Sequence, residues 1–373
     1  MRFFPVALLF TITLFAHSNL LGATPDRVYF GTYTKGDSKG IYVSDWDAKK
    51  GTLSNPVLAA EIENPSFLEL SDDGKFLYAV SEIKEGTIKA FQVLEEGALK
   101  LINEQSAEGS VTCHVSISND GKALVIANYT SGTVASYQIR KDGSLSEPVS
   151  VIQHEGSSTD PRRQQGPHAH SINFSLDDRF AYAADLGTDR IYRYSVDTDK
   201  GTLAASGETV IKAGSGPRHF TFTPNGDFAY VINEMALTVE AFSVTKETGE
   251  LKSIQTASTL PAEAPKQGST AEVVCHPTGK FLYGSNRGHD SIVVYQIDSS
   301  TGKLEYVENE PIEGEVPRNF AISPDGDWLI AAGQKSHTAS VFAIDPSSGE
   351  LTYSGNQAQL DSPVCVRFLS GTK

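Results

Sequence analysis

Two stretches of the chain decide the fold: PRHFTFTPNGDFAYVINE at residues 217–234 and PRNFAISPDGDWLIAAGQ at residues 317–334. In each, an alternating run of apolar and polar residues leads to a turn of Asn or Asp with Gly, and then to a second apolar run. Such alternation, bounded by Gly, Asp and Pro, is typical of half-buried antiparallel strands. No long segment shows convincing helical periodicity, so the sequence predicts an all-β protein.

A Gly-x-Leu turn recurs with the same period as this pattern. Its seven copies begin at Gly51, Gly97, Gly143, Gly201, Gly249, Gly302 and Gly349. Six of them lie near the end of a unit of about 46 to 58 residues, and the first closes a shorter, partial unit. Strand-rich repeats of this length predict a propeller. We therefore expect a seven-bladed β-propeller in which each blade is a four-stranded antiparallel sheet.

The two ends of the chain complement each other. The strands expected of a complete blade appear in the unit after Asn64, at residues 65–70, 76–80, 87–93 and from Leu99 onward. At the N-terminal end, residues 28–33 match a second strand and residues 40–46 match a third, but no first strand precedes them. The missing first strand returns as PVCVRF at residues 363–368. We expect this C-terminal strand to join the N-terminal blade, because closing the ring removes an exposed sheet edge.

Composition narrows the classes of function. The chain has 373 residues and a formal net charge of −15, which argues against broad binding to nucleic acid or anionic membranes. A small anionic substrate remains compatible with this charge, because a local cluster of Arg and His can hold one inside an acidic protein. Repeats add blades rather than domains, so we assign residues 24–373 to one propeller domain.

The first 23 residues have the pattern of an export signal peptide. Arg2 is followed by a largely apolar run at 3–15, and small residues at 16–18 and 21–23 offer cleavage sites. The apolar run is short for a membrane span, although an uncleaved anchor is the alternative. We therefore predict a periplasmic or secreted protein, free of the membrane once residues 1–23 are removed. If this segment is not a signal, the location is cytoplasmic.

The cysteines do not point to a cofactor or a disulfide framework. Cys113, Cys275 and Cys365 are an odd, sparse set, and each falls in a predicted inner strand where Cys commonly acts as a small buried hydrophobe. The sequence contains no Cys-x-x-Cys pair, no Gly-x-Ser-x-Gly elbow and no phosphate-cradling glycine loop. We predict no cofactor, and a reaction that uses activated water rather than a serine nucleophile.

The expected ring predicts which side chains meet. In each blade the first strand starts on the face where the second strand ends, so these positions surround one mouth of the central channel. The first-strand starts include Ser66, Cys113, His114, His168, His170, Arg218, His219, Glu272, Arg318 and Asn319, and the second-strand ends include Glu82, Tyr129, Asp185, Asn233, Glu234, Asn286 and Arg287. Buried charges are costly unless they are paired or functional. The cluster therefore predicts an anion-binding, acid–base site, with an ion-pair network between blades as the alternative.

Two longer connections, at residues 153–165 and 260–269, precede first strands and are expected on the same face as the mouth. Long loops on one face of a repeat array often mark its binding side. His168 and His170 share one face of a strand at this point, which raises the alternative of a metal site together with His219. Because these residues lack a compact ligand spacing, we predict no metal.

The sequence around the mouth resembles a known family. QGPHAHSINFSLDDRFAYAADLGTDRIYRY, GSGPRHFTFTPNGDFAYVINE and KFLYGSNRGHDSIVVYQI are similar to the lactonase family of seven-bladed propellers, which includes 6-phosphogluconolactonases and fungal carboxy-cis,cis-muconate cyclases. The likeness runs from Val28 to Phe368. The resemblance implies a site of one His, two Arg and one Glu. On this chain they fall on His170, Arg218, Arg287 and Glu234.

We therefore expect metal-independent hydrolysis of a small anionic lactone of the 6-phosphogluconolactone type. His170 is expected to act as general base on water, with Glu234 orienting it or sharing its proton, and His168 is the other candidate base. Arg218 and Arg287 are expected to hold an anionic group and the oxyanion. The side chains expected to bind substrate around them are His168, His114, His219, Arg318, Glu272, Asp185, Asn233 and Asn286.

Two alternatives remain open at this point. The same residues are suited to the reverse type of reaction, in which a carboxymuconate cyclase closes a lactone. An exported binding scaffold is the alternative from another class, because a propeller fold alone does not confer activity. In either enzyme the partner is a small lactone or carboxylate rather than a nucleic acid. The 6-phosphogluconolactone pathway is cytoplasmic, so either the natural substrate is another lactone outside the cytoplasm or residues 1–23 are not an export signal. No feature of the sequence indicates an oligomeric state.

Overall fold

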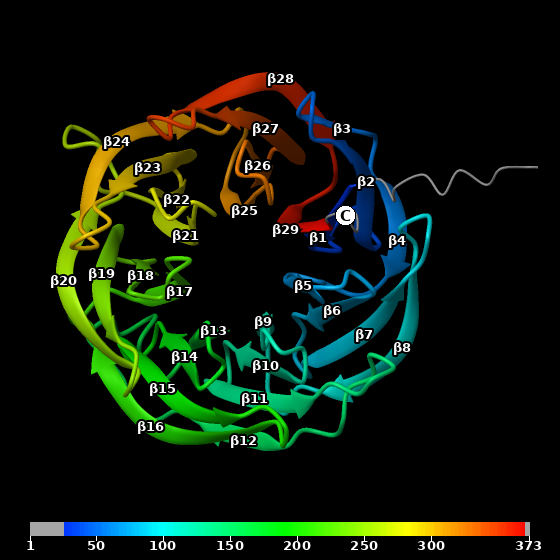
Figure 1. The fold of residues 1–373 in the computed structure, drawn as a ribbon, viewed down its shortest axis with the longest axis vertical. Coiled ribbons are helices and arrows are strands. Elements are labelled where there is room, and N and C mark those ends of the chain that lie inside the picture. Colours follow the sequence, from blue (N-terminus) through cyan, green and yellow to red (C-terminus); the bar gives the residue numbers. More distant parts are fainter. Residues whose placement is uncertain (1–25, 370–373) are drawn as a thin grey trace, which may run out of the picture.

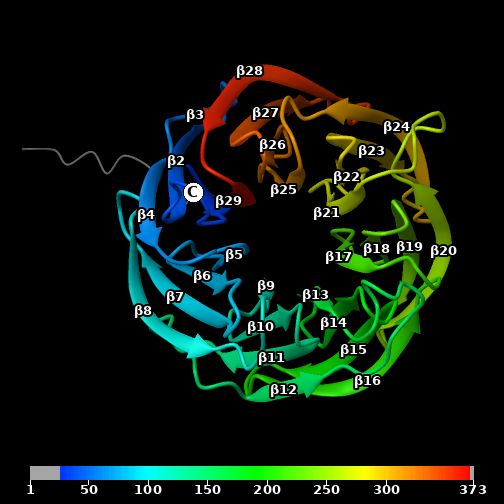
Figure 2. The same cartoon turned by 180° about the vertical axis from the view of Figure 1, so that it is seen from behind.

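The computed structural model describes residues 26–369, which form seven antiparallel sheets in a ring around one axis (Figures 1 and 2). The all-β, seven-bladed prediction is confirmed. This part of the chain contains no helix, and so none that is long and apolar enough to cross a membrane. The predicted export signal at residues 1–23 lies outside the described residues.

Each sheet runs from the axis to the rim. The inner strands are β5 (Leu68–Leu70), β9 (Thr112–Ile117), β13 (Ala169–Phe174), β17 (Pro217–Phe222), β21 (Ser269–Cys275), β25 (Pro317–Ile322) and β29 (Pro363–Leu369). The second strands are β6 (Phe76–Ser81), β10 (Ala123–Asn128), β14 (Phe180–Asp185), β18 (Phe228–Asn233), β22 (Phe281–Arg287), β26 (Trp328–Gly333) and β1 (Arg27–Thr32). The third strands are β7 (Thr87–Val93), β11 (Thr133–Gln138), β15 (Arg190–Asp197), β19 (Thr238–Thr245), β23 (Ser291–Ile297), β27 (Thr338–Ile344) and β2 (Gly40–Asp47). The outer strands are β8 (Leu99–Ser106), β12 (Ser150–Gln153), β16 (Thr202–Val210), β20 (Glu250–Ser258), β24 (Leu304–Pro311), β28 (Leu351–Gln359) and the pair β3 (Thr52–Leu53) and β4 (Val57–Glu61).

The ring is closed as the sequence predicts. β29, the last strand of the chain, pairs antiparallel with β1, so that Val366 lies opposite Phe30. Figure 1 shows this red strand beside the blue N-terminal strands. The closing blade differs from the predicted four strands, because its rim is divided into β3 and β4, which both pair with β2.

The core lies between neighbouring blades rather than on the axis. Apolar side chains, mostly of the second and third strands, interdigitate between neighbouring blades. Between two of the blades these are Tyr230, Ile232, Val239, Val273, Leu282 and Val293, all buried. Burial of apolar area stabilises each pair of sheets. The axis is left to the inner strands, which carry polar and ionisable side chains.

The Gly-x-Leu turns lock each blade to the one before it. All seven glycines have positive φ, such as 81° at Gly143, where the ring of Phe76 occupies the space that a Cβ would need. In five blades the glycine carbonyl accepts a hydrogen bond from a tyrosine on the preceding blade's second strand. The donors are Tyr29 to Gly97, Tyr78 to Gly143, Tyr182 to Gly249, Tyr230 to Gly302 and Tyr283 to Gly349, at 2.8 to 3.0 Å. Only glycine satisfies both the backbone angle and the close contact.

This lock predicts unequal costs for two Gly→Ala substitutions. Gly121 also has positive φ, 69°, but no atom lies within 4 Å of its Cβ position. Gly121→Ala is expected to cost the backbone strain alone, about 1–2 kcal/mol. Gly143→Ala adds overpacking against Phe76, which raises the total loss by roughly a further 1–3 kcal/mol. Urea unfolding of both variants tests this, and equal losses of stability would show that the contact with Phe76 has no energetic weight.

Candidate active site

A β-bulge at the start of the inner strands turns side chains into the channel mouth. In β17, Pro217 pairs with Asn233 and His219 pairs with Ile232, so Arg218 is an extra residue between them. The same register shift leaves Cys113, His170 and Arg318 as the extra residues of β9, β13 and β25. A bulge bends the strand and re-aims a side chain, which accounts for the clustering of these residues at one mouth.

Glu234, the residue after β18, is bound by three arginines. Its Oε2 lies 3.0 Å from Nε of Arg218 and 3.0 Å from Nη2 of Arg287, and its Oε1 accepts a hydrogen bond from Nη2 of Arg163 at 2.7 Å. Burial alone would raise the pKa of Glu234, but Arg287, Arg218 and Arg163 together lower it to about 2. The carboxylate is therefore ionised at neutral pH. This differs from the expectation that Glu234 orients His170 or shares its proton.

The arginines outnumber the carboxylates of the mouth. Burial, with repulsion from Arg318 and Arg287, lowers the pKa of Arg218 to about 10, so it is still protonated at pH 7. Arg318 lies 3.7 Å from Oε2 of Glu82 and its guanidinium carbon lies 5.4 Å from the ring centre of Tyr33. Four guanidinium groups, with that of Arg163, thus face the carboxylates of Glu234 and Glu82. The excess positive charge suits an anionic ligand.

His170 stands beside this cluster as a neutral imidazole. Burial, followed by the charge of Arg218, lowers its pKa well below the ordinary value for histidine. Its Nδ1 lies 3.7 Å from Sγ of Cys113, and its ring centre lies 5.4 Å from that of His219. Among residues 26–369, no group hydrogen-bonds to its Nε2, and this atom is not among the buried unpaired ones. A neutral imidazole with a free ring nitrogen is able to accept a proton from water.

His168 has a different environment, although it is two residues away. Its ring stacks on Tyr129 with 4.6 Å between ring centres, and its Nδ1 lies 2.8 Å from the carbonyl oxygen of Tyr129. The carbonyl accepts, so Nδ1 of His168 carries the proton. His168 therefore lines the half-buried outer part of the mouth, whereas His170 is buried. The geometry favours His170 as the base.

A second layer of side chains lies deeper in the channel. Nδ1 of His219 lies 2.7 Å from Oε1 of Glu272, which also accepts from the backbone N of Val273, while Asn319 donates to the other carboxylate oxygen. These donors indicate that Nδ1 of His219 carries a proton. Burial lowers the pKa of His219, so the ring is neutral, and its Nε2 is buried without a partner among the described residues. His114 packs on Phe67, with 4.2 Å between ring centres.

Three residues expected to bind substrate have partners within the protein. Asp185 is fully buried: its Oδ2 lies 2.6 Å from Nδ1 of His154, and its Oδ1 accepts from the backbone N of His168 at 2.9 Å. Asn233 is the last residue of β18 and Asn286 the second last of β22, and the amide Nδ2 of each donates to the hydroxyl five residues later, at 3.1 and 3.4 Å. Their polar character comes from the turn to the third strand, which recurs with the same period as the mouth residues.

The structure adds Arg163, which the sequence placed on a loop of the mouth face without a role. Besides Glu234, its Nη2 contacts the hydroxyl of Tyr129 at 3.0 Å. Tyr33 is a second addition, because its hydroxyl donates to both oxygens of Glu82, at 2.9 and 2.8 Å. The PRR run at residues 161–163 was a usable signal for Arg163, because it is an insertion in one blade. No repeated pattern marks Tyr33, which lies in the loop after β1.

The cysteines lie in inner strands as predicted. Cys113 and Cys365 are buried, Cys275 is half-buried, and all three are free. Burial raises the pKa of each thiol, to about 12 for Cys275 and about 11 for Cys365. The thiols are therefore protonated at neutral pH, the inert form.

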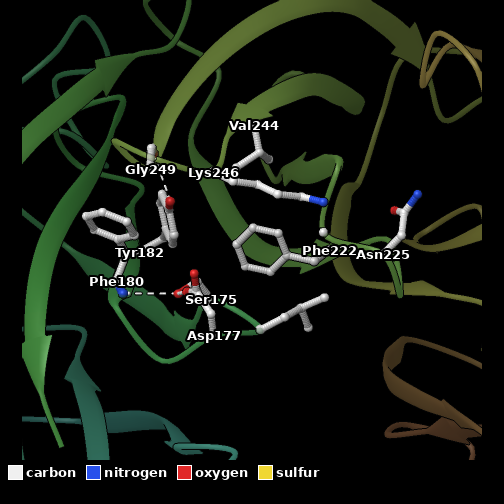
Figure 3. A pocket seen from close by; sticks show the side chains of 11 residues that line it. Ser175, Asp177, Phe180, Tyr182, Phe222, Asn225, Val244, Lys246 and Gly249 are labelled. Atoms are coloured by element: carbon white, nitrogen blue, oxygen red, sulfur yellow. Dashed lines mark hydrogen bonds between the residues drawn. The ribbon is translucent and has the colours of Figure 1, made fainter.

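Cavities away from the mouth carry different chemistry. A cavity of about 250 Å³ lies between two blades. Figure 3 shows side chains that line it, among them Phe180, Tyr182, Phe222 and Lys246. It adjoins the turn that follows β13, at the end of the blades opposite the mouth.

Within residues 26–369, no group of three or more His, Cys, Asp or Glu side chains is arranged to hold a metal ion.

Comparison with known proteins agrees with this geometry. Residues 27–368 match the family described as lactonase, 7-bladed beta-propeller. The chain belongs to the lactonase family. It is 35% identical to a 6-phosphogluconolactonase of Bacillus subtilis, over 91% of this chain and 97% of that protein. It is 37% identical to a 6-phosphogluconolactonase of Formosa agariphila, over 83% and 90% of the two chains.

A solved structure extends the comparison. The periplasmic gluconolactonase of Pseudomonas aeruginosa superposes with a TM-score of 0.87 at 32% identity, and the match covers 93% of this chain and 99% of that one. The predicted resemblance to propeller lactonases is confirmed over the whole described region.

The three arginines predict that Glu234 stabilises the fold in a pH-dependent way. The pKa of Glu234 is lowered from 4.5 to about 2, so its ionised form stabilises the protein above pH 4.5, and this contribution is lost as the pH falls toward 2. A shift of this size corresponds to on the order of 3 kcal/mol. Glu234→Gln is expected to lower the free energy of unfolding by that order at pH 7. Denaturant unfolding at several pH values measures the difference from wild type, which should shrink below pH 4.5. A difference independent of pH would contradict the ion-pair assignment.

Proposed function

We propose that the protein hydrolyses a small anionic lactone of the sugar type, such as 6-phosphogluconolactone, to the open-chain carboxylate. The observation that carries this proposal is the neutral imidazole of His170 beside a surplus of guanidinium groups. Membership of the lactonase family and relatives named 6-phosphogluconolactonase support carboxylic-ester hydrolysis.

In the proposed reaction His170 is the general base. It takes a proton from water as the water oxygen bonds to the lactone carbonyl carbon. When the ring C–O bond breaks, the leaving oxygen takes that proton back, and the carboxylic acid that forms releases one proton to solvent to give the carboxylate, so atoms and charge balance. The low pKa of the free site keeps His170 unprotonated before substrate arrives. A bound anion adds negative charge beside the ring and raises its pKa toward neutrality.

Arg218 and Arg287 are proposed to stabilise the oxyanion that forms at the lactone carbonyl. Both are fixed before substrate arrives, because each also donates to a backbone carbonyl, at Ala271 and Thr270, at 2.7 Å. Donors that are held in place stabilise developing charge without a reorganisation cost. Glu234 is then a positioning residue that holds the two guanidinium groups together. The mechanism uses protein groups and water, without a metal.

The roles of His170 and Arg218 predict large losses of turnover. His170→Ala removes the base and should lower kcat by roughly 10²- to 10⁴-fold. Arg218→Ala removes one oxyanion donor and should lower kcat by about 10²- to 10³-fold. pH-stat titration of acid release from 6-phosphogluconolactone, corrected for spontaneous hydrolysis, measures both.

The control for the metal-free claim is wild type dialysed against a chelator, which should keep its rate. Circular dichroism confirms that each variant is folded. Wild-type rates in both folded variants would reject the assignment, and loss of the ultraviolet absorbance of a carboxymuconate would indicate the cyclase reaction.

We further propose that the protein acts outside the cytoplasm. The apolar segment after Arg2 and the likeness to a periplasmic gluconolactonase support export. Mass spectrometry of the protein from cell fractions should find the mature N-terminus near residue 24 in the exported fraction. An intact N-terminus in the cytoplasmic fraction would contradict export without affecting the proposed chemistry.

A further inference from the structure

Given the proposed function, we propose that Arg163 selects the substrate: it binds a phosphate group at the far end of the lactone and so favours phosphorylated over uncharged lactones. The relatives include both a 6-phosphogluconolactonase and a gluconolactonase, so family membership leaves this choice open. The assignment rests on where Arg163 lies, which of its donors are free, and how its loop is held.

Arg163 is the accessible member of the arginine cluster. Its side chain is 41% exposed, against 2% for Arg218 and 16% for Arg287. Its Nη2 binds Glu234 and Tyr129, while its Nε and Nη1 have no partner among residues 26–369. Two nitrogens with N–H groups therefore remain for a ligand at the rim. A guanidinium with free donors matches the geometry of a phosphate.

The loop that carries Arg163 is anchored, so the guanidinium is held in place. Oδ1 of Asp160 accepts from the backbone N of Arg163 at 3.0 Å. The next residue, Gln164, is fully buried and donates to the carbonyl of Leu186 and to Oδ2 of Asp189, at 2.9 and 2.8 Å. Asp189 also accepts from Gly214 and Gly216, just before β17. This carboxylate ties the Arg163 loop to the strand of Arg218, so two guanidinium groups from different blades keep a set spacing.

The two deeper arginines, Arg218 and Arg287, already have partners within the protein. Arg218 and Arg287 bond to Glu234 and to backbone carbonyls, and Arg218 influences the pKa of His170 more than any other charged group. They lie where the reacting carbonyl is expected. Arg163 approaches Glu234 from the opposite carboxylate oxygen, on the side of Tyr129. Tyr129 links the two ends of this path, because its ring centre lies 5.2 Å from that of His170 and its hydroxyl lies 3.0 Å from Nη2 of Arg163. We therefore place the ester at His170 and the far substituent of the lactone toward Arg163.

The charges of the mouth fit a phosphate. A phosphate monoester carries close to two negative charges at pH 7 and three acceptor oxygens. The four guanidinium groups exceed the two carboxylates by the same amount. When Arg163 shares its donors with a phosphate, Glu234 keeps the ion pairs with Arg218 and Arg287 and remains compensated. Binding of a dianion at Arg163 thus leaves no buried charge unpaired.

The test compares two adjacent arginines of one loop. Arg162 is exposed, and its side chain makes no hydrogen bond or ion pair among the described residues, so Arg162→Ala is the matched control for Arg163→Ala. KM and kcat are measured with 6-phosphogluconolactone and with glucono-δ-lactone. Arg163→Ala should raise KM for the phosphorylated lactone by roughly 10- to 100-fold, the effect of a lost charge-assisted hydrogen bond. The readout is the ratio of the two KM values, phosphorylated over uncharged lactone: it should rise by that factor in Arg163→Ala and keep the wild-type value in Arg162→Ala.

A binding measurement separates this inference from the proposed function. Calorimetry with the products, 6-phosphogluconate and gluconate, needs no turnover. Wild type and Arg162→Ala should bind 6-phosphogluconate more tightly than gluconate, and Arg163→Ala should lose that preference. An unchanged preference in Arg163→Ala would overturn the role of Arg163, even if lactone hydrolysis is found. If wild type hydrolyses neither lactone, the proposed function fails, and the binding preference still decides the role of Arg163.

Discussion

The hydrogen bond from a tyrosine on one blade to a glycine carbonyl on the next is the interaction on which the ring depends. In five of the seven blades it fixes the second strand of one sheet against the turn of its neighbour, in a contact that admits no side chain on the glycine. Repetition of the same contact sets the rotation from blade to blade. Because the blades are placed by their own contacts, the axis is free to collect charged side chains that would be costly in a continuous core.

Two local features then bring functional side chains together at the channel mouth. The bulge at the start of the inner strands adds one residue where the strand meets the mouth, and in four of the blades that residue is Cys113, His170, Arg218 or Arg318. Glu234 collects guanidinium groups from three separate segments. The arginines repel one another when they are desolvated, so the buried carboxylate of Glu234 is needed to hold them close to one another. The same geometry supports both the stability of the mouth and the chemistry proposed for it.

Much of this arrangement was predictable from the sequence, because position in a repeat specifies position around an axis. The blade count, the closing strand and the place of His170, Arg218 and Arg287 at one mouth all follow from the period. The roles of Asn233 and Asn286 did not follow, because a strand-end asparagine that serves a turn recurs with the same period as a ligand-binding residue. The bulges were also missed, since strict alternation gives no sign of an extra residue.

The sequence also did not predict which residues bind Glu234, and the reason is physical. Repeat positions show that residues approach one another, but they do not show which donor reaches which oxygen. An unrepeated insertion, the loop of Arg163, supplied one of the three arginines. Non-repeated segments have no counterpart in other blades, so their side chains cannot be placed by comparison. Arg163, in such a segment, could therefore not be paired with Glu234 from the sequence.

The most direct test of the account is a crystal structure of the protein soaked with 6-phosphogluconate. The account predicts that the ligand occupies the channel mouth, with its carboxylate against Arg218 and Arg287 and its phosphate against Arg163. A ligand bound in the cavity between blades beside Phe180 and Tyr182, with the mouth filled by water alone, would contradict it.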